Sequence, residues 1–197
     1  MIRFNRCIDD IRTYQTGDLP DSAVRIETPS TVDDTMKHAA PIAAVLCLVM
    51  SVTVFAKVFF ARAAIAPAAV VIGFAVGLAL VIVHELLHAV VYPKEAAVTV
   101  GKLKGKLTFV ALASFPMSRA RFILMCLLPF VLGILPLAVF ILSPAEAKWL
   151  NGLTFGMACV GMISPFPDVY NVLTVLRKAN RTDRIMFYQD DLYKIAD

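Results

Sequence analysis

Four long apolar segments constrain the fold of this chain more than any other feature. They lie near Ala39–Phe60, Ile65–Tyr92, Phe122–Leu142 and Trp149–Leu176, and a helix needs about 20 apolar residues to cross roughly 30 Å of hydrocarbon. The composition agrees, because 59% of the 197 residues are hydrophobic and only 17% are charged. A soluble domain is nearer to about 45–50% apolar and about 25% charged. The segments therefore predict an all-α, multi-pass membrane protein with about four transmembrane helices.

The basic residues are distributed unevenly around these segments. Of the 19 Lys and Arg, 16 lie in the first 38 residues, in the segment 93–121 or in the tail that begins at Arg177. The opposite side has only Lys57, Arg62 and Lys148. Loops that are rich in Lys and Arg stay in the cytoplasm. The distribution predicts a multi-pass protein of the cell membrane with both termini cytoplasmic.

The same distribution bears on domains and partners. We expect a cytoplasmic arm (1–38), a transmembrane domain (39–176) and a cytoplasmic tail (177–197). Because the basic residues flank membrane spans, the net charge of +4 indicates topology within a lipid bilayer and not nucleic-acid binding. The four cysteines are scattered without C-x-x-C spacing, so we expect free thiols that act as small apolar residues.

Two G-x-x-x-G motifs lie in the second and fourth spans. They are formed by Gly73 with Gly77 and by Gly152 with Gly156. Small residues at this spacing let two helix backbones approach closely in lipid. The motifs favour close packing of these two spans, although ordinary small-residue packing is an equal alternative.

The stretch VIVHELLHAVVY (81–92) places ionisable side chains in an apolar helix, where they are costly. His84 and His88 are four residues apart and share a helix face, so both can bind one zinc ion through neutral imidazole nitrogens. Glu85 lies about 100° around the helix. In H-E-x-x-H hydrolases this glutamate accepts a proton from the water that zinc activates. The alternative is a structural pair of histidines, hydrogen-bonded across a helix interface with Glu85 as their partner.

A catalytic zinc site needs a third protein ligand, and Asp168 is the only other acidic residue within a predicted span. His84 and Asp168 each lie eight residues before the cytoplasmic end of a span, which is about 12 Å in a helix. Pro165 and Pro167 interrupt the helix before Asp168. Broken helix at membrane depth is tolerated where it lines a polar cavity. Asp168 is therefore the expected third ligand, and helix capping is its alternative role.

The segment 96–112, between the second and third spans, alternates in polarity from Lys102 to Phe109. This alternation predicts a short β-hairpin at the cytoplasmic interface, and Gly101 and Gly105 permit the turns or a bulge that it needs. The hairpin has two possible roles. It is either a plain connector that contacts anionic lipid or an edge strand that holds an extended substrate.

Three blocks of the sequence together resemble a known family. They are H-E-L-L-H in the second span, SRARFILMCLLPF (118–130) and SPFPDVYNVLTVLRK (164–178). Over roughly residues 70 to 195 the chain resembles the putative zincin peptidase family of small bacterial membrane proteins, which is similar in plan to site-2-type intramembrane metalloproteases. The resemblance implies that His84, His88 and Asp168 bind zinc and that Glu85 is the base. It also implies membrane-protein or peptide substrates that are cut within or beside the bilayer.

The expected function is thus a zinc-dependent intramembrane endopeptidase, with residues 39–176 as its metalloprotease-like domain. Two other functions stay open: a metal-binding membrane protein without peptidase activity, such as a sensor or carrier, and a catalytically silent membrane scaffold. Glu85 separates these functions, because a metal carrier needs the ligands but has no use for a base.

Overall fold

The computed structural model of the protein describes residues 1–26, 29, 31–105 and 108–196. They form two compact units. The helical unit comprises Ala39–His84 and Pro129–Phe166. The mixed unit comprises Met1–His38, Glu85–Leu128 and Pro167–Asp197.

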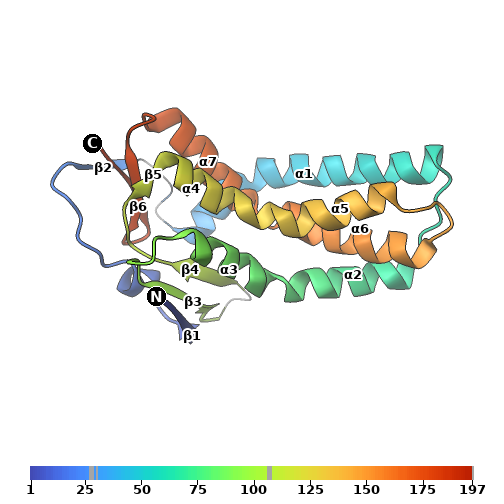
Figure 1. The fold of residues 1–197 in the computed structure, drawn as a ribbon, viewed down its shortest axis with the longest axis horizontal. Helices are drawn as coiled ribbons and strands as arrows, with labels where there is room; N and C mark the ends of the chain where they lie inside the picture. Colours follow the sequence, from blue (N-terminus) through green and yellow to red (C-terminus); the bar gives the residue numbers. More distant parts are fainter. Residues whose placement is uncertain (27–28, 30, 106–107, 197) are drawn as a thin grey trace. The chain divides into compact units, whose positions relative to one another are not determined.

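The helices account for the apolar segments of the sequence (Figure 1). They are α1 (Val32–Phe60), α2 (Pro67–Ala79), α3 (Val81–Val91), α4 (Arg119–Leu127), α5 (Val131–Leu142), α6 (Lys148–Ile163) and α7 (Phe166–Lys178), with short 3-10 helices η1 (Ile11–Tyr14) and η2 (Leu128–Phe130). Within the described residues they give four stretches that are long and apolar enough to cross a membrane: Asp33–Phe60, Pro67–Val91, Arg119–Leu142 and Lys148–Lys178. The four predicted spans are thereby confirmed by length and composition.

The second, third and fourth spans are each broken within their length. The break between α6 and α7 falls at Ser164 and Pro165, as predicted, because proline lacks the N–H that a helix interior requires. A second proline, Pro129, lies in η2 between α4 and α5. The break between α2 and α3 falls at Leu80 and has no proline. These last two breaks were not predicted.

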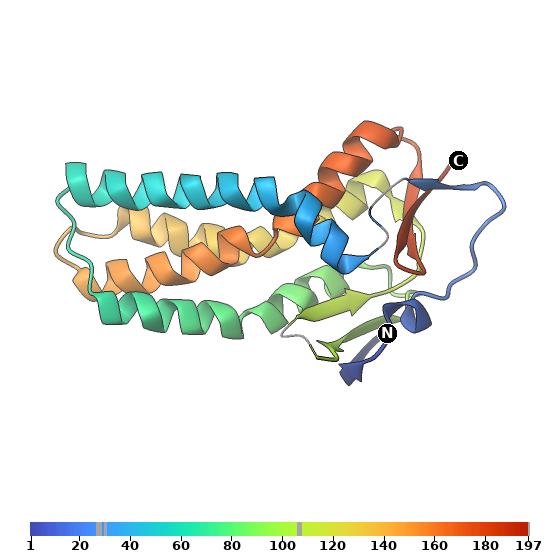
Figure 2. The ribbon, with the colours of Figure 1, turned by 180° about the vertical axis from the view of Figure 1, so that it is seen from behind.

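The helical unit consists of α1, α2, α5 and α6, which run alongside one another (Figures 1 and 2). Helix α6 packs against both α2 and α5. A Cβ atom added to Gly73 would lie 2.2 Å from the Leu153 oxygen, and one added to Gly156 would lie 2.3 Å from the Val70 oxygen. The close packing expected from the two G-x-x-x-G motifs is confirmed, since only glycine permits this approach.

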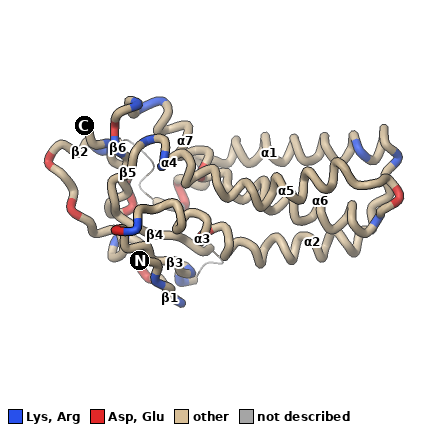
Figure 3. Tube along the Cα trace, in the orientation of Figure 1, with Lys and Arg blue, Asp and Glu red and all other residues tan. Residues whose placement is uncertain are grey.

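The surface of the helical unit is apolar. Many of its large hydrophobic side chains are exposed, among them Leu48, Phe55, Ile72, Leu135 and Leu142. Its Lys, Arg, Asp and Glu residues gather at one end, near the α1–α2 and α5–α6 loops (Figure 3). Soluble proteins rarely expose apolar patches of this extent, whereas hydrocarbon favours them.

The mixed unit contains two small sheets. In the first, the strand order is β1 (Ile2–Ile8), β3 (Val98–Leu103) and β4 (Phe109–Leu112). In the second, the order is β2 (Ala23–Ile26), β7 (Asp191–Ile195), β6 (Arg184–Tyr188) and β5 (Met117–Ser118). The predicted hairpin is confirmed in β3 and β4, which pair antiparallel; Lys106 and Leu107 of the predicted segment lie outside the described residues.

The all-α fold class is wrong, because the structure is mixed, with about 57% helix and 17% strand. Apart from the short β5, the unexpected strands come from the two ends of the chain. β1 pairs in parallel with β3, and β2 pairs antiparallel with β7. Each of these partners lies far away along the sequence, so local periodicity carried little information about the pairing.

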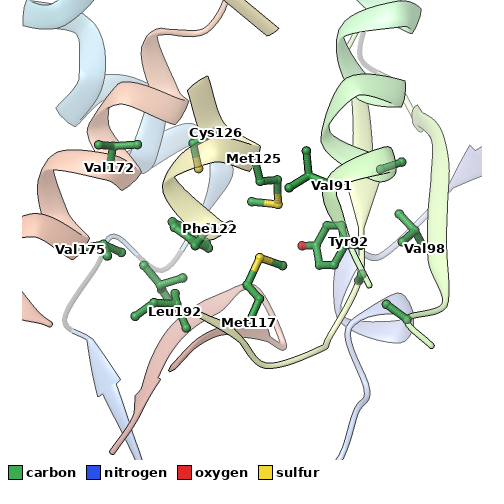
Figure 4. Close-up of a cluster of buried hydrophobic side chains, with 14 of the residues drawn as sticks. Val91, Tyr92, Val98, Met117, Phe122, Met125, Cys126, Val172, Val175 and Leu192 are labelled. Carbon is green, nitrogen blue, oxygen red and sulfur yellow. The ribbon is translucent and has the colours of Figure 1, made fainter. Parts of the chain in front are cut away.

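A hydrophobic core joins the helices of the mixed unit to its strands. Figure 4 shows side chains of α4 lying between those of α3 and α7. Phe122 is 1% exposed and Val175 is fully buried. Burial of such side chains stabilises the folded state by about 1.5–3 kcal/mol each. The core therefore fixes α3, α4 and α7 as one packed group. Its residues include Val91, Tyr92, Phe122, Met125, Cys126, Val172 and Val175.

Candidate metal site

The H-E-x-x-H residues lie together on helix α3. His84, Glu85 and His88 have exposed fractions of only 7%, 9% and 8%. One ligand atom from each lies within 4.8 Å of the others. The boundary between the two units falls between His84 and Glu85, so α3 itself holds these three side chains together. Buried polar groups require partners that replace water, and the partners of His88 and Glu85 define the site.

His88 has a partner on each of its ring nitrogens. Its Nδ1 lies 2.9 Å from the backbone oxygen of Met125 in α4. Because a carbonyl oxygen can only accept a hydrogen bond, Nδ1 carries the hydrogen, and in the neutral ring Nε2 then carries the lone pair. This Nε2 lies 3.5 Å from Oδ1 of Asp168. A backbone carbonyl on the second nitrogen is the usual way in which proteins orient a metal-binding histidine.

The separation between His88 and Asp168 is compatible with an ion pair and with two ligands of one metal ion. A charge-assisted N–H···O hydrogen bond is about 2.7–2.9 Å long, which is shorter than the observed 3.5 Å. Two ligands of a tetrahedral zinc ion, at about 2.1 Å from the metal, lie about 3.4 Å apart. His84, Glu85 and His88 thus form a possible metal site, and the spacing of Asp168 from His88 is compatible with a further ligand.

Asp168 is the third residue of α7 and lies in its first turn. The sequence predicts Asp168 at the depth of His84, whereas the structure places Asp168 beside His88, one turn nearer the end of α3. A carboxylate in the first turn also interacts favourably with the helix dipole. The capping role that was the alternative for Asp168 is thus compatible with a ligand role.

Glu85 lies next to the hairpin. Its carboxylate accepts a hydrogen bond from the backbone N–H of Ala111 in β4. Ala111 stands opposite Val100 of β3, and β4 is the outer strand of its sheet. Among the described strands, β4 has a partner on one side only, so its other edge is open near Ala111. The glutamate is therefore held beside this strand.

Sequence reasoning named the ionisable side chains but missed the groups that orient them. Met125 and Ala111 act through backbone atoms, which no side-chain pattern reveals. The free thiols were predicted and are confirmed: Cys7, Cys47, Cys126 and Cys159 form no disulfide. Cys126 lies in the buried core beside Met125.

Comparison with protein families gives a match to the model described as putative zincin peptidase, over residues 77–183. The matched region is more than half of the chain and includes α3, the hairpin, α4 and α7. Neither the proteins of curated function nor the solved structures gave a match. The matched region contains the buried His84, Glu85 and His88 and the facing Asp168, and the chain belongs to the putative zincin peptidase family.

Proposed function

We propose that the protein is a zinc-dependent intramembrane endopeptidase, with His84, His88 and Asp168 as the zinc ligands. The observation that carries this proposal is the geometry at His88. Its Nδ1 is held by the Met125 oxygen, and its Nε2 faces Asp168 at 3.5 Å, about the separation of two zinc ligands. Membership of a zincin family supports the same chemistry.

The chain's own residues supply the proton transfers. Zinc, when bound, would act as a Lewis acid toward the water and the scissile carbonyl. The Glu85 carboxylate takes a proton from the attacking water and delivers it to the nitrogen of the leaving amine. The hydrogen bond from Ala111 orients this carboxylate. Burial of the site excludes bulk water, which strengthens these interactions.

The open edge of β4 is the proposed support for the substrate. A transmembrane helix hides its peptide bonds in its own hydrogen bonds, so it must be extended before it can be cut. An extended peptide can pair with the free edge of an outer strand. On β4 it would lie beside Glu85, because the Ala111 N–H that contacts Glu85 belongs to that strand.

Location in the cell membrane with cytoplasmic termini is part of the proposal. Two backbone hydrogen bonds, Ala64 N–H to the Ala145 oxygen (2.8 Å) and Ala66 N–H to the Lys148 oxygen (3.0 Å), join the α1–α2 and α5–α6 loops. These bonds support a topology in which both loops lie on the same side of the membrane. The loops contain few basic residues, which favours the external side.

The test compares Glu85→Gln with wild type and with Glu95→Gln, which changes an exposed glutamate outside the site. Zinc content of the purified proteins and new amino termini in the membrane proteome of expressing cells are measured. Glu85→Gln should keep zinc and lose all cleavage, because the base is lost while the ligands remain. His88→Ala should lose both zinc and cleavage. Cleavage by Glu85→Gln at the wild-type rate would refute the peptidase mechanism and favour a metal carrier.

A further inference from the structure

The start of α4 contacts the carboxyl ends of both helices that carry the site. Ser118 accepts a hydrogen bond from the Arg121 N–H at 3.3 Å and so caps α4. Arg121 Nε donates to the oxygen of Val91, the last residue of α3, at 2.6 Å. Arg119 Nη2 donates to the oxygen of Leu176, in the last turn of α7, at 3.2 Å. The S-R-A-R sequence thus reaches both site helices.

These contacts are of a kind that fixes helix ends. The last carbonyls of a helix have no partner within the helix, and they form the negative end of its dipole. A guanidinium that donates to such a carbonyl makes a charge-assisted hydrogen bond, which is stronger than a neutral one. Arg121 therefore holds the end of α3, which carries His88, and Arg119 holds the end of α7, which carries Asp168.

A third contact ties the same helix to the site itself. Met125, four residues after Arg121, accepts the hydrogen bond from His88 Nδ1. Helix α4 thus contacts α3 both at its end and at its histidine. Figure 4 shows the side chains of α4 packed between those of α3 and α7. The position of α4 therefore sets the separation between His88 and Asp168.

The guanidinium of Arg119 has a feature that stability alone does not explain. Its Nε is buried and has no hydrogen-bond partner within the described residues. A buried donor without a partner is a cost that natural proteins rarely keep. The guanidinium reaches α7 through Nη2, which donates to the Leu176 oxygen.

We propose that Arg119 and Arg121 are positioning residues of the zinc site, which hold α7 and α3 against α4 so that Asp168 and His88 stand at ligand separation. This inference rests on the proposed zinc site and extends it to residues that touch neither metal nor substrate. Partners hydrogen-bonded to metal ligands typically contribute about 10–100-fold to metal affinity, and the Met125 oxygen of α4 is such a partner of His88.

The test uses the full-length protein in detergent and the double variant Arg119→Gln/Arg121→Gln. Its zinc affinity is measured by competition with a chelating dye, and the absorption spectrum of its Co²⁺ form is recorded. We expect zinc binding at least about tenfold weaker than in wild type and a Co²⁺ spectrum that departs from the tetrahedral form. The control, Arg177→Gln/Arg181→Gln, removes the same charge from two exposed arginines at and after the end of α7 and should change neither measurement.

The outcomes separate this inference from the proposed function. Wild type that binds zinc no better than His88→Ala would refute the metal site itself. Wild type that binds tightly while the double variant matches it in affinity or in Co²⁺ spectrum would refute only the role of the arginines. If circular dichroism shows that the double variant does not fold, Arg121→Lys replaces it. Its ammonium keeps the charge but not the guanidinium geometry, so we expect zinc binding several-fold weaker, and unchanged affinity would overturn the inference.

Discussion

Replacing Asn151 by Ala should destabilise the helical unit more than any other single truncation at the loop end. Asn151 is fully buried near the start of α6, and its amide is the centre of a polar network. Its Nδ2 donates to the oxygens of Ala64 (3.1 Å), Pro144 (3.0 Å) and Ala145 (3.3 Å), and its Oδ1 accepts from Lys57 Nζ (2.9 Å) and Ser143 Oγ (2.5 Å). One side chain thus connects α1, both loops and α6.

The expected loss in the free energy of unfolding follows from the hydrogen bonds of Asn151 that no other group replaces in the Ala variant. An NH₂ group has two hydrogens, so the three donated contacts amount to about two full hydrogen bonds. Lys57 keeps its contacts with Ser143 and with the Phe140 oxygen, and Ser143 keeps its own with the Phe140 oxygen. The Ala variant then loses two neutral hydrogen bonds, at about 1 kcal/mol each, and part of the hydrogen bond from the Lys57 ammonium, which is worth about 2 kcal/mol. We expect a loss of about 3 kcal/mol in the free energy of unfolding.

Unfolding by SDS in mixed micelles, followed by circular dichroism, measures this loss, and Trp149 adds a local signal. It is the only tryptophan in the chain and lies two residues before Asn151. The control is Thr154→Ala, one turn onward, whose buried hydroxyl donates at 2.7 Å to Leu150 of the same helix. That variant should lose less than about 1 kcal/mol. If Asn151→Ala costs no more than Thr154→Ala, the network does not hold the loops together and the reasoning fails.

Two further predictions concern pH and topology. Burial raises the pKa of Asp190 from 3.8 to about 6, so between these values the folded protein binds a proton that the unfolded chain releases. Stability should therefore rise as the pH falls from about 6 to about 4, by about 1 kcal/mol after allowance for solvent screening at this partly exposed group; denaturant titrations of Asp190→Asn should not show this component. Reporter fusions after Ser143 should read external and those after Ala196 cytoplasmic, and a cytoplasmic signal at Ser143 would overturn the proposed topology.

The spans could be predicted because hydropathy is a local property, whereas two of their breaks could not. Pro165 marks the break in the fourth span by its chemistry. Leu80, where the second span is interrupted, is apolar and favourable in a helix. The mean hydropathy of the segment therefore does not change at Leu80 and gives no sign of the break. The strands of β1 and β2 were missed for a related reason, since their partners β3 and β7 are far away in the sequence.

The site was predictable where its chemistry lies in side chains at fixed spacing. The grouping of His84 and His88 follows from helix geometry, whereas Asp168 stays a proposed ligand, named because it is the only other acidic residue within a predicted span. The Met125 oxygen could not be predicted, because every residue has a backbone carbonyl and only the tertiary structure selects one. Arg119 and Arg121 of α4 belong to the block SRARFILMCLLPF (118–130). Nothing in their spacing indicates which helix ends they contact.

The breaks in the spans and the site residues have a common physical basis. Helix α3 begins three residues before His84, and α7 begins two residues before Asp168. Helices α2 and α6 are in close contact at Gly73 and Gly156. If α2 and α3, or α6 and α7, were continuous helices, this contact would also restrict where His84 and Asp168 can lie. A break separates the two requirements, but it leaves backbone groups that hydrocarbon cannot satisfy. Such a break is tolerable only beside polar groups or buried protein, and the proposed metal site would supply polar groups. The polar residues that destabilise these two spans in a bilayer therefore also allow the helices to be interrupted beside them. For this reason we expect the helix breaks and the proposed ligands to stay adjacent in any functional variant of this chain.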